Sequence, residues 1–131
     1  NKGSDIGKEA MLAIEPEPGP EVLTGSTRLK AGTAQKMVLN MISTGSMVGI
    51  GKAYENLMVD VIQSNEKLIV RAQNIVITAT GCKREDAREA LDAAKGHVKT
   101  AIVMILLGCD ALQAKKRLEA GDGKTRKALQ E

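Results

Sequence analysis

The chain contains 131 residues, of which 43% are hydrophobic, and its 19 basic and 16 acidic residues give a net charge of +3. This length allows one domain, or a small domain together with part of another. The charges are mixed along the chain, a single tyrosine is its only aromatic residue and no apolar run approaches ~20 residues, so the sequence predicts neither a nucleic-acid partner nor a membrane span.

Two cysteines, Cys82 and Cys109, stand without a second cysteine or a histidine at metal-ligand spacing. We therefore expect reduced thiols rather than a metal site or a structural disulfide. No signal peptide is visible, and the sequence predicts a cytoplasmic protein.

The first 15 residues predict a loop and a short helix, followed by a strand with the sequence MLAIE at residues 11–15. Such alternation is typical of the middle of an α/β domain, in which helical crossovers join parallel strands. Too few strands follow to complete a sheet, so we expect the chain to begin inside such a domain.

The segment from Gly19 to Lys36, GPEVLTGSTRLKAGTAQK, places a turn, a hydroxyl cluster and cations directly before a long predicted helix. A helix N-terminus presents unpaired N–H groups and about half a positive charge, so it favours a phosphate or carboxylate. The side chains that could complete such an anion site are Thr24, Ser26, Thr27, Arg28 and Lys30. A plain helix cap with solvated cations is the alternative interpretation.

The residues from Ala31 onward predict a helix that ends near Gly49 to Gly51. Its apolar residues at helical spacing are Ala34, Val38, Met41, Ile42, Gly45 and Val48, and Met37, Leu39 and Met47 widen that face. So wide an apolar surface predicts a buried central helix.

Residues 56–65 predict an irregular link, after which Ser64 or Asn65 can cap a second helix. The apolar positions of this helix are Leu68, Ala72, Ile75, Val76 and Ala79. The β-branched run at residues 75–80 would also suit a strand, but the spacing before it favours a helix that Gly81 ends.

The last 51 residues contain a weak internal repeat with an offset of 27 residues. The matching pairs are Gly81 and Gly108, Cys82 and Cys109, Ala87 and Ala114, Leu91 and Leu118, Gly96 and Gly123, and Ala101 and Ala128. Each unit predicts a helix, a glycine turn and a second helix, and the two units predict one small helical bundle.

Five segments resemble the N-acetylmuramic acid 6-phosphate etherase family, within the sugar isomerase (SIS) superfamily that also holds the glucokinase regulatory protein. They are GPEVLTGSTRLKAGTAQK at residues 19–36, MVLNMISTGSM at 37–47, NLMVDV at 56–61, NEKL at 65–68 and KTAIVMILL at 99–107. The resemblance covers essentially the whole chain, and a motif of this length is more specific than a short glycine pattern.

The resemblance implies a mainly α chain that forms the C-terminal part of an α/β SIS domain, followed by a small UBA-like helical bundle. The expected limits are 1–62 for the SIS part, 63–80 for a connecting helix and 81–131 for the bundle. A lid or a subunit contact is the expected role of the bundle.

The resemblance also implies a lyase that cleaves the D-lactyl ether of N-acetylmuramic acid 6-phosphate, giving N-acetylglucosamine 6-phosphate and D-lactate during recycling of peptidoglycan sugar. No metal or organic cofactor is expected. The acid/base glutamates of the family lie upstream of the residue that aligns with Asn1, so no catalytic residue is assigned and we expect this chain to be inactive alone.

What the resemblance leaves for this chain is recognition of the sugar 6-phosphate. The implied substrate-binding residues are Ser26, Thr27, Arg28, Lys30 and Lys67, with Lys67 reaching the phosphate from a lid. Glu21, in the Gly-Pro-Glu turn, could hydrogen-bond a sugar hydroxyl or act as a base, and binding is favoured over chemistry. His97, the single histidine, sits at a predicted helix start, where a surface or capping role is favoured over catalysis.

Two other classes stay open at this point. A non-catalytic sugar-phosphate sensor would bind the same ligand without releasing lactate. A purely structural module would bind no sugar phosphate, and the loop would serve only as a cap. In each case the apolar central helix predicts a homo-oligomer.

Overall fold

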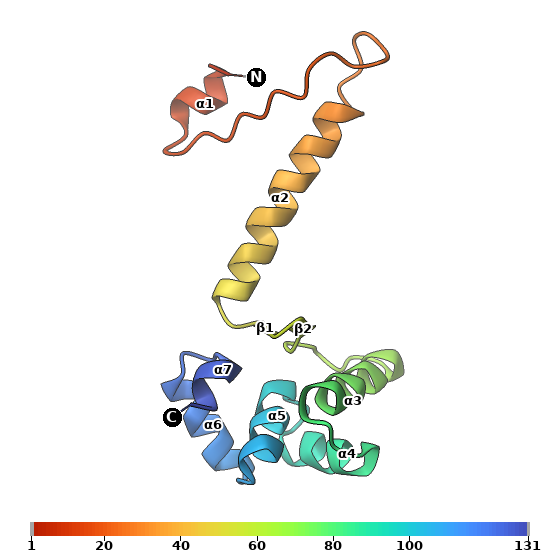
Figure 1. The fold of residues 1–131 in the computed structure, drawn as a ribbon, viewed down its shortest axis with the longest axis vertical. Helices are drawn as coiled ribbons and strands as arrows, with labels where there is room; N and C mark the ends of the chain where they lie inside the picture. Colours follow the sequence, from red (N-terminus) through yellow and green to blue (C-terminus); the bar gives the residue numbers. More distant parts are fainter. Residues whose placement is uncertain (1, 131) are drawn as a thin grey trace. The chain divides into compact units, whose positions relative to one another are not determined.

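The computed structural model describes residues 2–130 and divides the chain into two compact units, Asn1–Gly45 and Ser46–Glu131. Helices dominate both units, as Figure 1 shows, and the strands of the described part form a single two-stranded sheet. The mainly α composition predicted from the sequence is therefore confirmed.

The first unit begins with helix α1, Asp5–Glu9, whose N-cap Ser4 accepts a hydrogen bond from the Gly7 N–H. This short helix was expected, but the strand predicted at residues 11–15 is wrong, because these residues form bends and irregular chain. A strand needs a neighbouring strand to pair its N–H and C=O groups, and the described part of this unit supplies none.

Helix α2, Lys30–Gly49, begins and ends where the sequence predicts, but the described chain does not bury it, which is the exposure expected when the sheet partners of a central helix are missing. None of its residues is buried, and Met37, Met41 and Ile42 expose 58%, 63% and 52% of their surface. Within the described chain, α1 and the segment around Glu15 lie beside Ala34 and Val38 and leave both half-buried, while the rest of the apolar face is exposed.

The second unit opens with a small antiparallel hairpin, β1 Ala53–Tyr54 and β2 Leu57–Met58. The sequence predicted an irregular link over 56–65, so its first part is wrong. Glu55 turns the chain with a φ of 51°, and the Val59 N–H then donates to the Lys52 carbonyl. Such a short hairpin has too weak a period-2 pattern to be seen in the sequence.

Helix α3, Glu66–Thr80, confirms the predicted capping at both ends. The Asn65 side chain accepts from the Leu68 N–H, and Gly81 ends the helix in the left-handed region with a φ of 73°. Ala72, Ile75 and Val76 are buried, as their spacing predicted. The β-branched run is helical because its apolar side chains share one face that packs against a core.

The remaining helices repeat with the predicted offset. Helix α4, Arg84–Ala93, corresponds to α6, Ala111–Ala120, and α5, Val98–Leu107, corresponds to α7, Thr125–Ala128. The turns also match, because the Gly96 N–H donates to the Leu91 carbonyl at 2.8 Å and the Gly123 N–H to the Leu118 carbonyl at 2.7 Å. The repeat is therefore a repeat of structure as well as of sequence.

Helix α5 belongs to both halves of this repeat, as its central place among the helices in Figure 1 indicates. It packs with α3 and α4 around one apolar cluster and with α6 and α7 around a second. Its Ile102 lies in the first cluster and its Val103 in the second, while Met104 packs against both. Two overlapping three-helix sets thus share one helix.

A lysine ties the start of the second unit to this bundle. The Lys99 ammonium on α5 donates to the Gly51 carbonyl at 3.4 Å and to the Gly123 carbonyl at 3.0 Å. Gly51 is buried, and its neighbour across the contact is the turn between α6 and α7. The limits at 62 and 80 predicted for domains stay a prediction, although α3 packs directly on α4 and α5.

Candidate anion-binding site

The N-terminus of α2 is capped by a carboxylate of the chain itself. The two oxygens of Glu21 accept hydrogen bonds from the Lys30 N–H at 2.9 Å and from the Ala31 N–H at 3.1 Å. These bonds lower the pKa of Glu21 below its ordinary value, and the bond from the Lys30 N–H contributes most, followed by that from the Ala31 N–H. Partial burial of the carboxyl raises the pKa, and the positive charge of Lys30 lowers it further. The helix dipole therefore already has an anion beside it.

The loop before α2 bends tightly to bring this carboxylate into place. The Ser26 N–H donates to the Leu23 carbonyl at 3.0 Å, and Gly25 adopts a φ of 85°, which a residue with a Cβ rarely reaches. The hydroxyl cluster on this bend thus lies within a few residues of the helix start.

The predicted hydroxyl and basic ligands lie around this start and are open to solvent. Thr27, Arg28 and Lys30 are exposed and Ser26 is half-buried. Within residues 2–130, neither Arg28 nor Lys30 forms a salt bridge to a carboxylate. The loop therefore presents hydroxyls and two cations without a salt bridge among the described residues, with the Glu21 carboxylate near enough to feel the Lys30 charge.

Two other candidate site residues, Lys67 and His97, lie in the second unit. Lys67 occupies the first turn of α3 and is exposed. His97 occupies the N-cap of α5, is exposed, and makes no side-chain capping bond, which agrees with the surface role predicted for it. No cluster of three metal-binding side chains occurs among the described residues.

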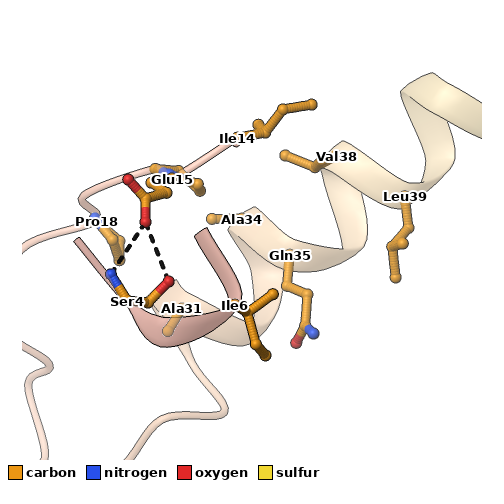
Figure 2. A pocket seen from close by; sticks show the side chains of 11 residues that line it. Ser4, Ile6, Ile14, Glu15, Pro18, Ala31, Ala34, Gln35, Val38 and Leu39 are labelled. Atoms are coloured by element: carbon orange, nitrogen blue, oxygen red, sulfur yellow. Dashed lines mark hydrogen bonds between the residues drawn. The ribbon is translucent and has the colours of Figure 1, made fainter. Parts of the chain in front are cut away.

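A pocket of about 420 Å³ in the first unit was not predicted from the sequence. Figure 2 shows side chains from α1, from the segment around Glu15 and from the first turns of α2 around it. Most of the lining is apolar, including Ile6, Ile14 and Val38, and the polar side chains are those of Ser4, Glu15 and Gln35. No short motif could have revealed it, because the lining joins segments that lie about 30 residues apart.

Glu15 fixes one edge of this pocket. Its carboxylate accepts hydrogen bonds from the Ser4 N–H at 3.3 Å and from the Ser4 hydroxyl at 3.1 Å, which are the two dashed lines of Figure 2, and from the Gly3 N–H at 3.3 Å. Partial burial opposes ionisation, but the hydrogen bonds from Ser4 and Gly3 outweigh it and lower the pKa of Glu15. The carboxylate thus acts as a tie between α1 and the chain that follows.

Known proteins of similar sequence indicate which family the chain resembles. An N-acetylmuramic acid 6-phosphate etherase of Geobacillus sp. strain WCH70 is 61% identical over 130 residues, which are 99% of this chain and 44% of the relative. The etherase of Geobacillus thermodenitrificans is 62% identical over 130 residues, 99% of this chain and 44% of its own length. That of Cutibacterium acnes is 60% identical over 131 residues, the whole of this chain and 43% of the relative.

Over essentially its whole length, the chain is similar in sequence to part of each of these N-acetylmuramic acid 6-phosphate etherases, at about 60% identity. The family resemblance predicted from the motifs is therefore confirmed. No protein-family model matches the chain. The chain spans less than half the length of the curated etherases that it matches.

The etherase motifs fall on both units of the structure. The motif at residues 19–36 forms the capped loop and the first turns of α2, and the motif at residues 65–68 forms the N-cap and first turn of α3. No described helix of the chain is long and apolar enough to span a membrane.

Proposed function

We propose that this chain supplies the phosphate-recognition part of a lyase that cleaves the D-lactyl ether of N-acetylmuramic acid 6-phosphate. The observation that carries the proposal is the match of about 60% identity over essentially the whole chain to proteins named for that reaction. The hydroxyls and exposed cations at the start of α2 support it, because a phosphate needs such groups and neither Arg28 nor Lys30 forms a salt bridge in the described part.

The reaction is an elimination followed by a hydration. A base removes the proton α to the C1 aldehyde of the opened sugar, an acid protonates the departing lactate oxygen, and water then adds to the double bond. The products are N-acetylglucosamine 6-phosphate and D-lactate, which belong to the recycling of cell-wall sugar. We assign neither the acid nor the base to this chain, whose part is to hold the phosphate end of the substrate.

Each proposed ligand has a distinct task. The hydroxyls of Ser26 and Thr27 donate hydrogen bonds to phosphate oxygens, the Arg28 guanidinium binds two oxygens at once, and Lys30 adds a second positive charge. Lys67 acts as a lid residue at the start of α3. Glu21 belongs to the same site, since its carboxylate lies on the first N–H groups of the helix that carries Lys30.

The finer architecture of the proposal also follows the family. We assign residues 1–62 to an SIS-type sugar-phosphate domain and residues 81–131 to a UBA-like bundle that serves as a lid or a subunit contact. The exposed apolar face of α2 supports a homo-oligomer, because a soluble protein rarely leaves so much apolar surface in water.

The test of the reaction is D-lactate release from N-acetylmuramic acid 6-phosphate. We expect release by a full-length etherase into which these 131 residues are grafted, and no release by the chain alone. Release by the chain alone would place a catalytic acid and base within it. No D-lactate release by either the grafted etherase or the chain alone, with retained binding of the sugar phosphate, would favour a non-catalytic sensor. The names of the relatives do not favour that alternative.

The test of the site is the pair of variants Arg28→Ala and Arg88→Ala in the grafted enzyme. A lost charge-assisted hydrogen bond costs about 1.5–3 kcal/mol, so Arg28→Ala should lower kcat/KM by roughly 10- to 100-fold. Arg88 is an exposed arginine of α4 and serves as the matched control, with expected kcat/KM unchanged. Equal values for both variants would remove Arg28 from the site.

A further inference from the structure

The side chain of Glu21 closes a ring in the chain. It leaves the backbone before the loop at residues 22–29 and binds the backbone directly after it, at Lys30 and Ala31. Every candidate hydroxyl of the loop, and Arg28 with it, therefore lies between the two ends of one hydrogen-bonded closure. Within the loop the Ser26 N–H also donates to the Leu23 carbonyl, and at its end the Leu29 carbonyl accepts from the N–H and the hydroxyl of Thr33.

The two hydrogen bonds of the Glu21 carboxylate hold the loop at residues 22–29 against the start of α2. Two backbone donors hold the two carboxylate oxygens separately, so the group is fixed in orientation as well as in position. The same donors lower the pKa of Glu21, because they stabilise the ionised form that accepts both hydrogen bonds. The loop itself buries no large side chain, since Val22 and Leu23 expose 94% and 64% of their surface, so packing does not hold it in place.

We propose that Glu21 is a positioning residue that latches the 22–29 loop onto α2, and so presents Ser26, Thr27 and Arg28 to a phosphate that Glu21 itself does not touch. The inference deepens the proposed function and rests on it. A carboxylate and a phosphate repel each other, and Glu21 already occupies the N–H groups of Lys30 and Ala31 that a phosphate would otherwise use. The phosphate therefore binds the loop side chains and leaves those two N–H groups to Glu21.

The first test measures loop order without any ligand, by backbone ¹⁵N relaxation of the 131-residue chain. In the variant Glu21→Ala we expect the heteronuclear NOE values of residues 22–29 to fall toward those of a flexible segment, while those of α3 to α7 stay unchanged. Glu17→Ala is the matched control, because Glu17 is an exposed acid of the same segment whose ion pair is with Lys2. Unchanged loop order in Glu21→Ala would overturn the latch.

The second test titrates inorganic phosphate and follows the amide shifts of Ser26, Thr27 and Arg28. We expect Glu21→Ala to weaken the apparent affinity roughly fivefold, the scale of a lost helix-capping contact, and Glu17→Ala to leave it unchanged. Stronger binding in Glu21→Ala would mean that the carboxylate only repels the ligand. Weaker binding with full loop order would mean that Glu21 contacts the ligand directly, and either result overturns the proposal.

A double variant separates loop positioning from simple capping. Leu29 directly precedes α2 and is 44% exposed, so Leu29→Asp can place a local capping carboxylate there. In Glu21→Ala/Leu29→Asp we expect the amide shifts of the first helical turn to return toward those of the native chain, while phosphate affinity stays low. Full recovery of affinity would show that only the cap matters and would overturn the latch.

The two proposals fail in different ways. If inorganic phosphate moves no amide of residues 26–28 in the native chain, the phosphate site of the proposed function is wrong. The relaxation experiment still decides whether Glu21 orders the loop, because it needs no ligand.

Discussion

Helices α2 and α5 are both rich in apolar residues, yet they differ completely in burial. The 20 residues of α2 include none that is buried, whereas the 10 residues of α5 include four, Val98, Ala101, Ile102 and Val103. The difference lies in their neighbours, because α5 packs against four other helices and α2 has no such packing in the described chain. Apolar content thus indicates which helices need partners, and the rest of the chain decides whether the partners are there.

The largest expected effect on stability comes from replacing a buried isoleucine of α5 with alanine, compared with the same change at an exposed isoleucine of α2. Ile102→Ala in α5 removes a fully buried side chain and should lower the free energy of unfolding by about 2–5 kcal/mol. Ile42→Ala in α2 removes a side chain that is 52% exposed and should cost less than about 0.5 kcal/mol. Urea unfolding followed by circular dichroism measures both, and equal losses would mean that α2 has a buried partner in solution.

A smaller effect is expected where the chain leaves α2 and meets the bundle. Gly51 has a φ of 80°, and a Cβ added to it would lie 2.9 Å from the Gly123 carbonyl oxygen, so Gly51→Ala should destabilise the second unit by about 2 kcal/mol. Gly45→Ala is the control, because no atom lies within 4 Å of its added Cβ and alanine favours a helix by up to about 1 kcal/mol. Thermal midpoints that shift in the same direction for both variants would contradict the close contact at Gly51.

The two halves of the repeat differ at one buried position, and this predicts a stabilising change. Thr125 lies where the first half has Val98, is 1% exposed, and its hydroxyl has no hydrogen-bond partner in the described structure. Thr125→Val should raise the free energy of unfolding by about 1–2 kcal/mol, since it removes an unpaired buried hydroxyl without changing the shape. The reverse change, Val98→Thr, should lower it by a similar amount. A loss of stability in Thr125→Val would reveal a partner for the hydroxyl in solution.

The smallest effect concerns the hairpin and acidic pH. The Lys52 ammonium binds Asp60 at 2.8 Å and lowers the pKa of that carboxyl, and burial only partly opposes the shift. A lowered folded-state pKa adds stability above the unfolded-state value of 3.8, and this stability is lost as the pH falls through the folded-state value. Both side chains are about 40% exposed, so the contribution should stay below about 1 kcal/mol.

Unfolding measured at pH 6 and at pH 2.5 in native chain and in Asp60→Asn checks this contribution. The difference in free energy of unfolding between the native chain and Asp60→Asn should be smaller at pH 2.5 than at pH 6. The exposed Asp92 of α4 provides the control variant, Asp92→Asn, for which we expect no such narrowing. A gap that is constant with pH would mean that the pair adds nothing through charge.

Much of the second unit could be predicted from its sequence because its signals are local. Asn65 and Gly81 mark the two ends of α3 within one turn, and the glycines of the repeat recur at a fixed offset. The strand predicted at residues 11–15 is wrong, and α2 is not buried, for one reason. Both depend on partners distant in the sequence, and periodicity carries no information about whether those partners are present.

The residue types of the candidate site could be predicted from the sequence, but the hydrogen bonds and contacts that they make could not. The hydroxyls and cations at residues 24–30 are visible as a motif, and the structure places them beside the start of α2 as expected. The cap was missed because capping rules consider a residue directly before the helix, whereas Glu21 reaches across nine positions to Lys30. The pocket beside Glu15 was missed because its lining comes from three separate segments.

The sharing of α5 has a consequence for how such a bundle can grow. Because the last helix of one three-helix set is the first helix of the next, one more 27-residue unit would add two helices and one more core. Architecture of this kind lengthens as a solenoid does, in which each step is stabilised by the step before it.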